Sequence, residues 1–268
     1  MATEETTAAQ GQNFIDDRKI DVYKDLDPAI RIRTKKMLMW FIIFAVVMLF
    51  AGLTSALIVL YGKLIWLHLT PPAELWTSNV LIILSSLTLI GSLAAIKKGS
   101  QKLGLALHVV TLFLGIGFAV SQHAAWKKMS GNGLGYTITQ NEQGLDAYRW
   151  NTLGKVKGEY GKDFWFEMGN EKLVLENNEY YKPSDPSKPV TNTVMTTFNA
   201  FGALISILIY IHVFHLLFGL AYLAFNTYRI SKGRINSTNT LSITVNGMYW
   251  HFLGLLWLYL FWFLFFVF

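Results

Sequence analysis

Six histidines are the residues of this sequence that could bind a metal ion or a haem. His212 and His215 are three residues apart, so on a helix both imidazoles lie on one face, with Gly219 one turn further along it. His251 has a glycine on either side at helical spacing, which would bring another helix backbone against its imidazole. Imidazoles that converge from facing helices can ligate a metal ion or a b-type haem. In a tightly packed bundle they can equally hydrogen-bond neighbouring polar groups.

The surrounding residues favour the second interpretation. A ligating imidazole is usually oriented by a carboxylate or another acceptor on its second ring nitrogen. No acidic residue is present in the apolar segments that contain His108, His123, His212, His215 and His251. The sequence has no cysteine, which excludes disulfides, thiolate metal sites and cysteine nucleophiles. These segments also contain no Ser-His-Asp arrangement and no phosphate-binding loop. The residues therefore predict no catalytic centre in this chain.

The elements that must position these residues follow from where the charges fall. The chain has 268 residues, of which only 15% are charged, whereas soluble domains have about 25%. The 23 basic and 17 acidic residues all lie outside five blocks, which are 37–62, 75–96, 103–126, 197–225 and 241–268. Each block is longer than the roughly 20 residues that span a bilayer as a helix. The sequence predicts an all-α polytopic membrane protein, a bundle of five transmembrane helices, and excludes soluble enzymes and DNA-binding domains.

The basic residues predict the topology of the bundle. The segment 1–36 ends with four basic residues close to the first span. The short loops 97–102 and 226–240 contain basic residues and no acidic ones, whereas the short loop 63–74 has a single basic residue. We therefore expect the N-terminus inside and the C-terminus outside. The net charge of +6 is then a topology signal, and we expect no nucleic-acid partner.

The chain is predicted to divide into four parts. These are a cytoplasmic N-terminal segment (1–36), transmembrane helices one to three (37–126), a long periplasmic loop (127–196) and transmembrane helices four and five (197–268). The second and third spans are joined by only six residues, which predicts an antiparallel hairpin. The long loop opens with glycines, closes with prolines and has aromatic residues between. This mixture suits a small ordered cap or a docking surface.

The last two blocks resemble a known family. His212 to Gly219 has the pattern H-x-x-H-x-x-x-G. The final block contains Tyr249-Trp250-His251-Phe252, and Trp257 lies six residues beyond that histidine. Both patterns are similar to the penultimate and final helices of subunit III of the haem-copper terminal oxidases.

The other three blocks are also similar to that family. Trp40, followed by Met48-Leu49-Phe50-Ala51, resembles its opening span. Ser85-Ser86-Leu87-Thr88 resembles its second span, and Gln122 in the third block fits its third. The resemblance covers all five spans and matches the short bacterial form, which lacks the first two helices of the seven-helix version.

The resemblance implies a non-catalytic subunit III of a cytochrome c oxidase in a bacterial cytoplasmic membrane. Such a chain binds phospholipid but no haem or copper, and it stabilises the catalytic subunit while the complex reduces oxygen and pumps protons. Its partners would be catalytic subunit I, which carries haem and copper, subunit II and small subunits. We expect Trp250 and Trp257 at helix contacts, and His212, His215 and His251 as a polar spine of the bundle.

The chain departs from the family pattern at three positions that usually carry a carboxylate. Val46, Ala125 and Gly254 stand there instead, which argues against a carboxylate-based role in proton handling. The loop 127–196 is also longer than the family's usual connection. We hypothesise that it contacts cytochrome c or a neighbouring respiratory complex.

Two alternatives from other classes stay open, besides subunit III of a quinol oxidase. One is a membrane b-type cytochrome that ligates haem through two intramembrane histidines. The other is a small transporter, which the lack of any charged residue in the five blocks argues against.

Overall fold

The computed structural model describes residues 27–61, 63, 65–131, 159–162, 164–177 and 179–266. Its five helices are α1 (Pro28–Tyr61), α2 (Ala73–Lys97), α3 (Gln101–Gly131), α4 (Thr191–Ser231) and α5 (Leu241–Phe266). Each contains a stretch long and apolar enough to cross a membrane. The prediction of a mostly helical, multi-pass membrane protein is thereby confirmed for this part of the chain. Residues 1–26 of the predicted N-terminal segment and 132–158 of the predicted long loop lie outside the described residues.

The helices extend beyond the charge-free blocks because Lys and Arg at their ends cover apolar surface with aliphatic stems and keep the charge in water. α1 begins at Pro28, whose missing N–H is not needed in a first turn. Asp27 caps it, since its Oδ1 accepts a hydrogen bond from the Ala29 N–H at 2.9 Å. α2 and α4 each end two residues before a glycine with positive φ, Gly99 at 84° and Gly233 at 69°. Glycine adopts this conformation without strain.

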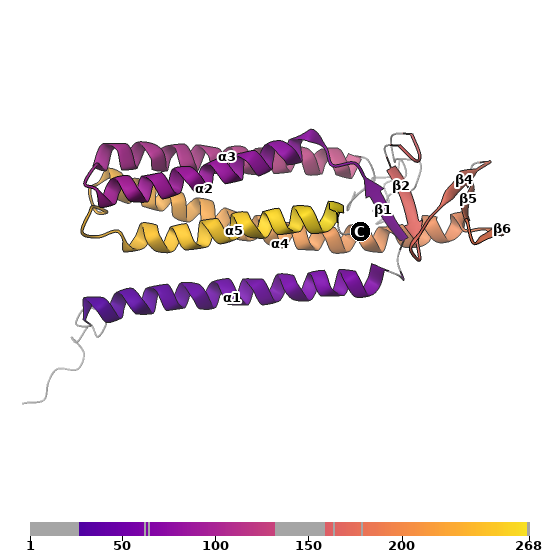
Figure 1. The fold of residues 1–268 in the computed structure, drawn as a ribbon, viewed down its shortest axis with the longest axis horizontal. Helices are drawn as coiled ribbons and strands as arrows, with labels where there is room; N and C mark the ends of the chain where they lie inside the picture. The colour runs from indigo at the N-terminus through magenta and orange to yellow at the C-terminus, as the bar shows by residue number, and fades with distance from the viewer. Residues whose placement is uncertain are drawn as a thin grey trace, which may run out of the picture.

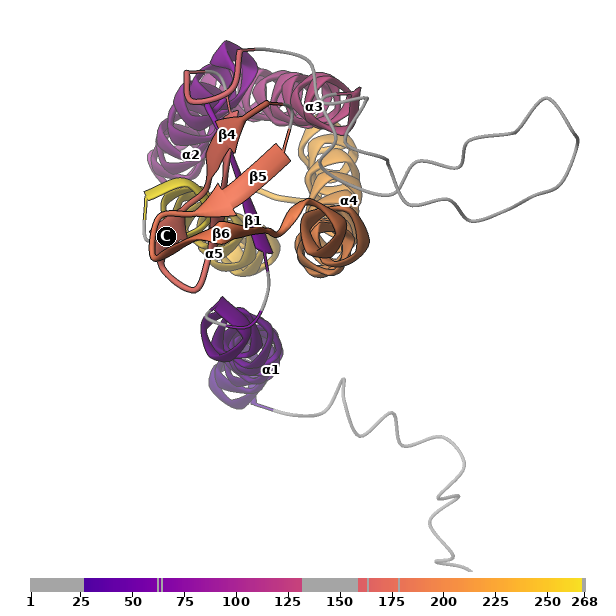
Figure 2. The same cartoon turned by 90° about the vertical axis from the view of Figure 1, so that its right-hand side faces the viewer.

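Four of the helices form a closed ring. α2 and α3 are the predicted antiparallel hairpin, joined by residues 98–100, and they pack along their length (Figure 1). α4 packs on α3, α5 packs on α4, and the ring closes where α5 contacts α2. Viewed along the bundle, these four helices lie together while α1 stands to one side of them (Figure 2).

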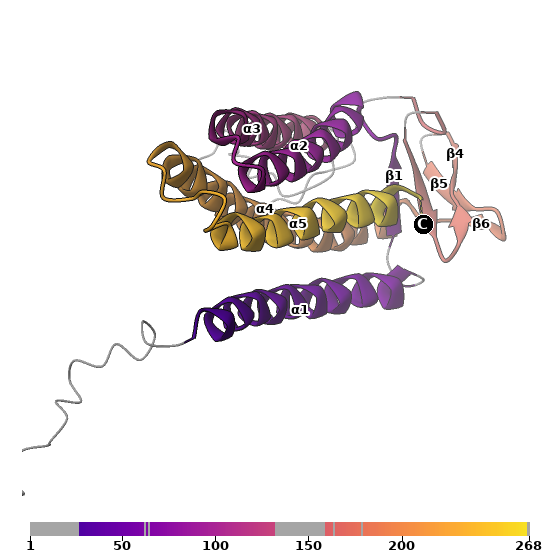
Figure 3. The same ribbon diagram turned by 60° about the vertical axis from the view of Figure 1, so that its left-hand side comes forward.

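α1 is attached to this four-helix ring along one stripe. Its buried residues recur every three or four positions and are Ile43, Val46, Phe50, Thr54 and Leu57. Large side chains on the rest of the helix, such as Phe44, are exposed. α1 contacts α5 and α4 and lies apart from α2 and α3 (Figure 3). Most of its surface is therefore available to lipid or to another chain.

At the end of the bundle opposite the start of α1, the described residues form six short strands in two antiparallel sheets. The first has the order β1 (Ile65–Leu69), β2 (Phe164–Met168) and β3 (Glu171–Lys172). The second has the order β4 (Val174–Glu176), β5 (Glu179–Lys182) and β6 (Asp185–Pro189). β1 pairs with β2 from Ile65 opposite Met168 to Leu69 opposite Phe164. We call this end the sheet end.

These strands correct the all-α prediction, because the fold is mostly helical with a small β cap (Figure 1). β1 lies in the segment 63–74, which the sequence predicts as a turn between spans. Its partner β2 lies in the long loop, on the far side of two helices in the chain. A strand of five residues has little periodicity of its own, and pairing over such a distance leaves no local pattern.

The opposite end, which we call the basic end, consists of the start of α1, the turn 98–100 and the loop 232–240 (Figure 1). The three segments that carry the predicted topology signal meet there. Their basic residues are Arg31, Arg33, Lys35, Lys36, Lys97, Lys98, Lys102, Arg229, Lys232 and Arg234. That this end faces the cytoplasm stays a prediction.

Candidate functional site

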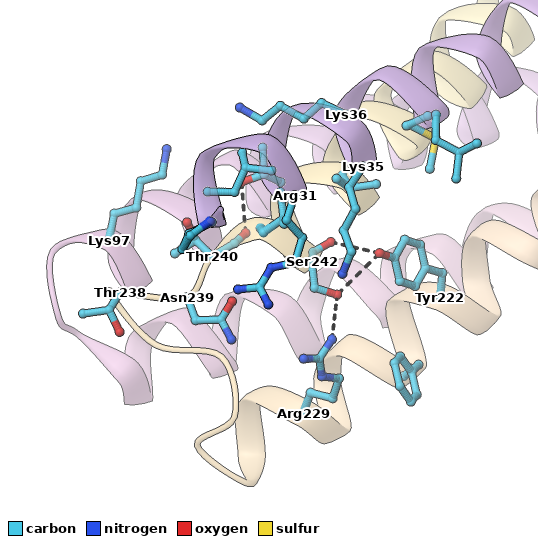
Figure 4. A pocket seen from close by; sticks show the side chains of 18 of the residues that line it. Arg31, Lys35, Lys36, Lys97, Tyr222, Arg229, Thr238, Asn239, Thr240 and Ser242 are labelled. Carbon is cyan, nitrogen blue, oxygen red and sulfur yellow. Dashed lines mark hydrogen bonds between the residues drawn. The ribbon is translucent and has the colours of Figure 1, made fainter. Parts of the chain in front are cut away.

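A cavity of about 930 Å³ opens at the basic end between α1, the end of α4 and the loop 232–240 (Figure 4). We call it the basic pocket. Cations from three helices line it: Arg31, Lys35, Lys36, Lys97 and Arg229. None of the described residues that line it is acidic. Its size suits a small organic ligand, and its charge suits an anionic one.

Hydrogen bonds position Arg229 at the floor of the basic pocket (Figure 4). Its Nη1 donates to the Ser242 hydroxyl at 3.0 Å. That hydroxyl donates in turn to Oδ1 of Asn226 at 2.7 Å. The Tyr222 hydroxyl donates to the Ser242 carbonyl at 3.3 Å. Arg229 is thus held between α4 and α5 and is pre-organised to bind an anion.

The basic pocket also has apolar walls. Leu38, Met39 and Ile42 of α1 line it on one side, and Phe225 of α4 lines it on another. A site that combines several cations with apolar side chains, at the end of a membrane-spanning bundle, matches an amphiphile with an anionic head group and an acyl chain.

The two motifs that carry the family resemblance pack directly against each other. The Tyr249 hydroxyl of α5 donates to the His215 carbonyl of α4 at 3.2 Å. A Cβ at Gly219 would lie 3.2 Å from the ring of Trp250, so the glycine permits the close approach of α4 and α5. The patterns H-x-x-H-x-x-x-G and Y-W-H-F therefore form one helix–helix contact.

Two tryptophans of α5 also tie this helix to α2. The indole N–H of Trp250 donates to Oγ of Ser85, and that of Trp257 donates to Oδ1 of Asn79, both at 2.9 Å. All four side chains are buried. Two turns before Ser85 on the same side of α2, the Ser78 hydroxyl accepts a hydrogen bond from Nε2 of Gln122 on α3 at 2.6 Å. Ser78 and Ser85, seven residues apart on α2, thus both form hydrogen bonds to neighbouring helices. We call this row of α2 side chains the polar line.

The histidines do not form the expected polar spine. His212 is buried between the rings of Phe50 and Trp257, at centroid distances of 6.3 Å and 5.5 Å. Neither of its ring nitrogens has a hydrogen-bond partner among the described residues. Nδ1 of His215 bonds to the Ile211 carbonyl of its own helix at 2.7 Å. The imidazole of His212 therefore packs against aromatic rings and does not link helices by hydrogen bonds. The hydrogen bonds between α5 and α2 are made by tryptophan, serine and asparagine side chains.

The remaining predicted residues lie outside these contacts. His251 is half-buried and has no hydrogen-bond partner in the described part of the chain. Trp40 on α1 is 61% exposed. In the same part of the chain, no group of three or more His, Asp or Glu side chains could hold a metal ion.

The three positions where the family usually has a carboxylate serve packing here. Val46 belongs to the buried stripe of α1. Ala125 of α3 is fully buried. A Cβ at Gly254 would lie 3.1 Å from Cγ1 of Ile82, so α5 approaches α2 closely at this glycine. A carboxylate would have to be buried at each of these positions.

Tyr61, His68 and Glu167 form a cluster at the sheet end that is not predicted from the sequence. The Tyr61 hydroxyl at the end of α1 donates to Oε1 of Glu167 on β2. Nε2 of His68 on β1 lies 2.9 Å from the other carboxylate oxygen, and its ring stacks on Trp165. Burial lowers the pKa of His68, although the nearby Glu167 carboxylate acts in the opposite direction. This cluster joins α1 to the first sheet.

Comparison with models of known protein families found no match for this chain, and comparison with curated proteins found none either.

Proposed function

We propose that this chain is a non-catalytic subunit, of the subunit III kind, of a haem-copper terminal oxidase in a bacterial cytoplasmic membrane. It stabilises the catalytic subunit and retains phospholipid while the complex reduces oxygen and pumps protons. Haem and copper are supplied by partner subunits.

The contact between the two motifs is the observation that carries this proposal. His215 and Gly219 on α4 meet Tyr249 and Trp250 on α5. Residues that resemble the family only as short patterns are thus brought together as one packing unit. The faces that carry the two patterns are those by which α4 and α5 pack on each other.

The basic pocket supports the phospholipid part of the proposal. A phospholipid has a phosphate that Arg229 can bind bidentately and acyl chains that fit beside Leu38 and Ile42. The pocket lies where a helix bundle meets the head-group region, so the ligand needs no path through the protein. An anionic lipid bound there would hold α1 against the ends of α4 and α5.

Purification from native membranes tests the identity of the complex. The tagged chain is purified in mild detergent, and its eluate is analysed by visible spectroscopy and mass spectrometry. We expect a haem-containing partner to co-purify, whereas the chain expressed by itself stays colourless. A haem band in the isolated chain would replace this proposal with the b-type cytochrome. A colourless chain without any partner would contradict both.

The electron donor separates the two oxidase versions of the proposal. We favour cytochrome c over quinol, because the sheet end offers a sizeable extramembrane surface next to which a soluble donor could dock. The test compares turnover of the complex with reduced cytochrome c and with quinol, before and after β4–β6 are replaced by a short turn. Turnover with quinol alone would indicate a quinol oxidase.

Phospholipid retention is tested with matched arginine variants. Arg229→Gln removes a cation from the basic pocket, whereas Arg234→Gln removes one from the adjacent loop without touching the pocket lining. After extensive detergent washing, we expect less bound phospholipid for the first variant and an unchanged amount for the second. Equal retention in both variants would contradict the assignment of the pocket.

A further inference from the structure

Four polar atoms are buried without a partner in the half of the bundle nearest the basic end. Among the described residues, they are Nε2 of His108, Nδ2 of Asn226, and both Nδ2 and Oδ1 of Asn246. All three side chains are completely inaccessible from the surface. A polar atom left dry in this position costs free energy, and more so within a bilayer, where lipid offers no substitute.

The three residues converge on one place, although they come from three helices. The backbone of Leu223 on α4 is near enough to interact with the imidazole of His108 on α3, although Nε2 makes no hydrogen bond of normal geometry. Asn226 is less than one turn further along α4. Oδ1 of Asn226 accepts the hydrogen bond from Ser242 on α5. Asn246 follows Ser242 by four residues, so it lies on the same face of α5. The unpaired atoms thus surround the junction of α3, α4 and α5.

This junction is closed toward the sheet end. A Cβ at Gly115 of α3 would lie 2.8 Å from the ring of Trp250 on α5 and 2.9 Å from Leu220 on α4. The three helices are therefore in tight contact there. Trp250 is fully buried, and its indole N–H already donates to the Ser85 hydroxyl. In the next turn of α3 after His108, the buried hydroxyl of Thr111 is already bonded to the Leu107 carbonyl and to the Thr88 hydroxyl.

Toward the basic end the same junction is polar. Ser242 lines the basic pocket (Figure 4). Its hydroxyl also donates a hydrogen bond to Asn226. Tyr222 lines the pocket as well and bonds to the Ser242 carbonyl. The unpaired atoms are thus one hydrogen-bonded residue away from a cavity that opens at the membrane surface.

We infer that water enters the bundle from the basic pocket past Ser242 and binds at the junction of α3, α4 and α5, hydrating His108, Asn226 and Asn246. Buried water usually makes about three hydrogen bonds to groups that the protein leaves unpaired. Asn246 supplies both a donor and an acceptor, and water can bond to either because it both accepts and donates. This hydration site is formed by residues of this chain alone. The inference is therefore independent of the complex to which the chain belongs.

Single-cysteine variants of the full chain test the site directly, because the sequence has no cysteine and a new S–H group gives the only S–H infrared band. Asn246→Cys places that group at the junction. Leu253→Cys is the matched control, since Leu253 is equally buried on α5 but lies beyond Trp250. On transfer to heavy water, we expect the S–H of Asn246→Cys to exchange at least about tenfold faster than that of the control. Equal rates would overturn the inference.

A second variant keeps the test decisive if the cysteine at position 246 impairs folding. Asn246→Leu has nearly the same shape without the amide. In a dry site it would remove two unpaired polar atoms and leave Tm unchanged or raise it. In a hydrated site it displaces bound water and lowers Tm, which is the result we expect. A Tm that stays unchanged or rises would contradict the inference.

Discussion

The indole N–H of Trp257 donates to Oδ1 of Asn79 across 2.9 Å, which joins α5 to α2 inside the apolar core. Replacement of Asn79 by Leu leaves this N–H without an acceptor. We expect the free energy of unfolding to fall by about 1–3 kcal/mol, the usual cost of a buried unpaired donor. Unfolding in mixed detergent micelles measures it. In the background of Trp257→Phe, Asn79→Leu should cost much less, and equal costs in both backgrounds would show that the bond is unimportant.

Gly115 allows α3 to approach Trp250 closely, since a Cβ there would lie 2.8 Å from the indole ring. We expect Gly115→Ala to lower the free energy of unfolding by about 1–3 kcal/mol through overpacking. Gly52→Ala is the control, because nothing lies within 4 Å of its Cβ position on α1. There alanine should be neutral or slightly stabilising through its higher helix propensity. Thermal unfolding of both variants distinguishes the two effects, and a harmless Gly115→Ala would contradict the packing described here.

Phe50 fastens α1 to the four-helix ring, because its ring lies between those of His212 and His215 on α4, about 6 Å from each. We expect Phe50→Ala to weaken the docking of α1 by about 3 kcal/mol, through the cavity left in the contact. Phe44→Ala, on the same helix but 63% exposed, should have little effect. Cross-linking yield between single cysteines on α1 and α5 measures the docking. Equal yields in the two variants would refute the single-stripe attachment.

The stability of the sheet end should depend on pH through His68. Burial lowers the pKa of His68 below its usual 6.5 in the folded state. Between the folded and the unfolded pKa the unfolded chain binds more protons, so acidification through 6.5 and below destabilises this end. Amide hydrogen exchange of residues 164–168 at a series of pH values measures it. His68→Phe keeps a ring on Trp165 and should remove most of the response. A response that persists in this variant would assign it to another group.

The helices could be predicted from the sequence because exclusion of charge from a bilayer acts locally on every residue. The five charge-free blocks all fall within helices where the chain is described. Their ends were predicted too short, because Arg229 and Lys97 continue a helix while their charges reach the surface. The side of the membrane on which each end lies rests on the basic loops and stays a prediction.

The site could be predicted only in part. The spacing of His212 and His215 indicates one helix face, but a sequence does not show which residues that face meets. The structure places Phe50 and Trp257 against His212, so its surroundings are aromatic. Ser78 and Ser85 at spacing seven were a readable signal for the polar line on α2. The basic pocket is formed by segments that are distant in the chain. Their basic residues indicate on which side of the membrane they lie, but they do not show that the segments enclose a cavity.

The pairing of β1 with β2 has a consequence for the order in which the protein is made. Tyr61 and Glu167, which meet beside these strands, are 106 residues apart in the chain. During synthesis, β1 emerges long before its partner and must wait while α2 and α3 are inserted. The first sheet therefore closes late, and closing it fixes the far end of α1 only after the first three helices are in place. Until then the first sheet does not hold the end of α1, so we expect the exposed surface of α1 to be accessible to lipid or to another chain while synthesis continues.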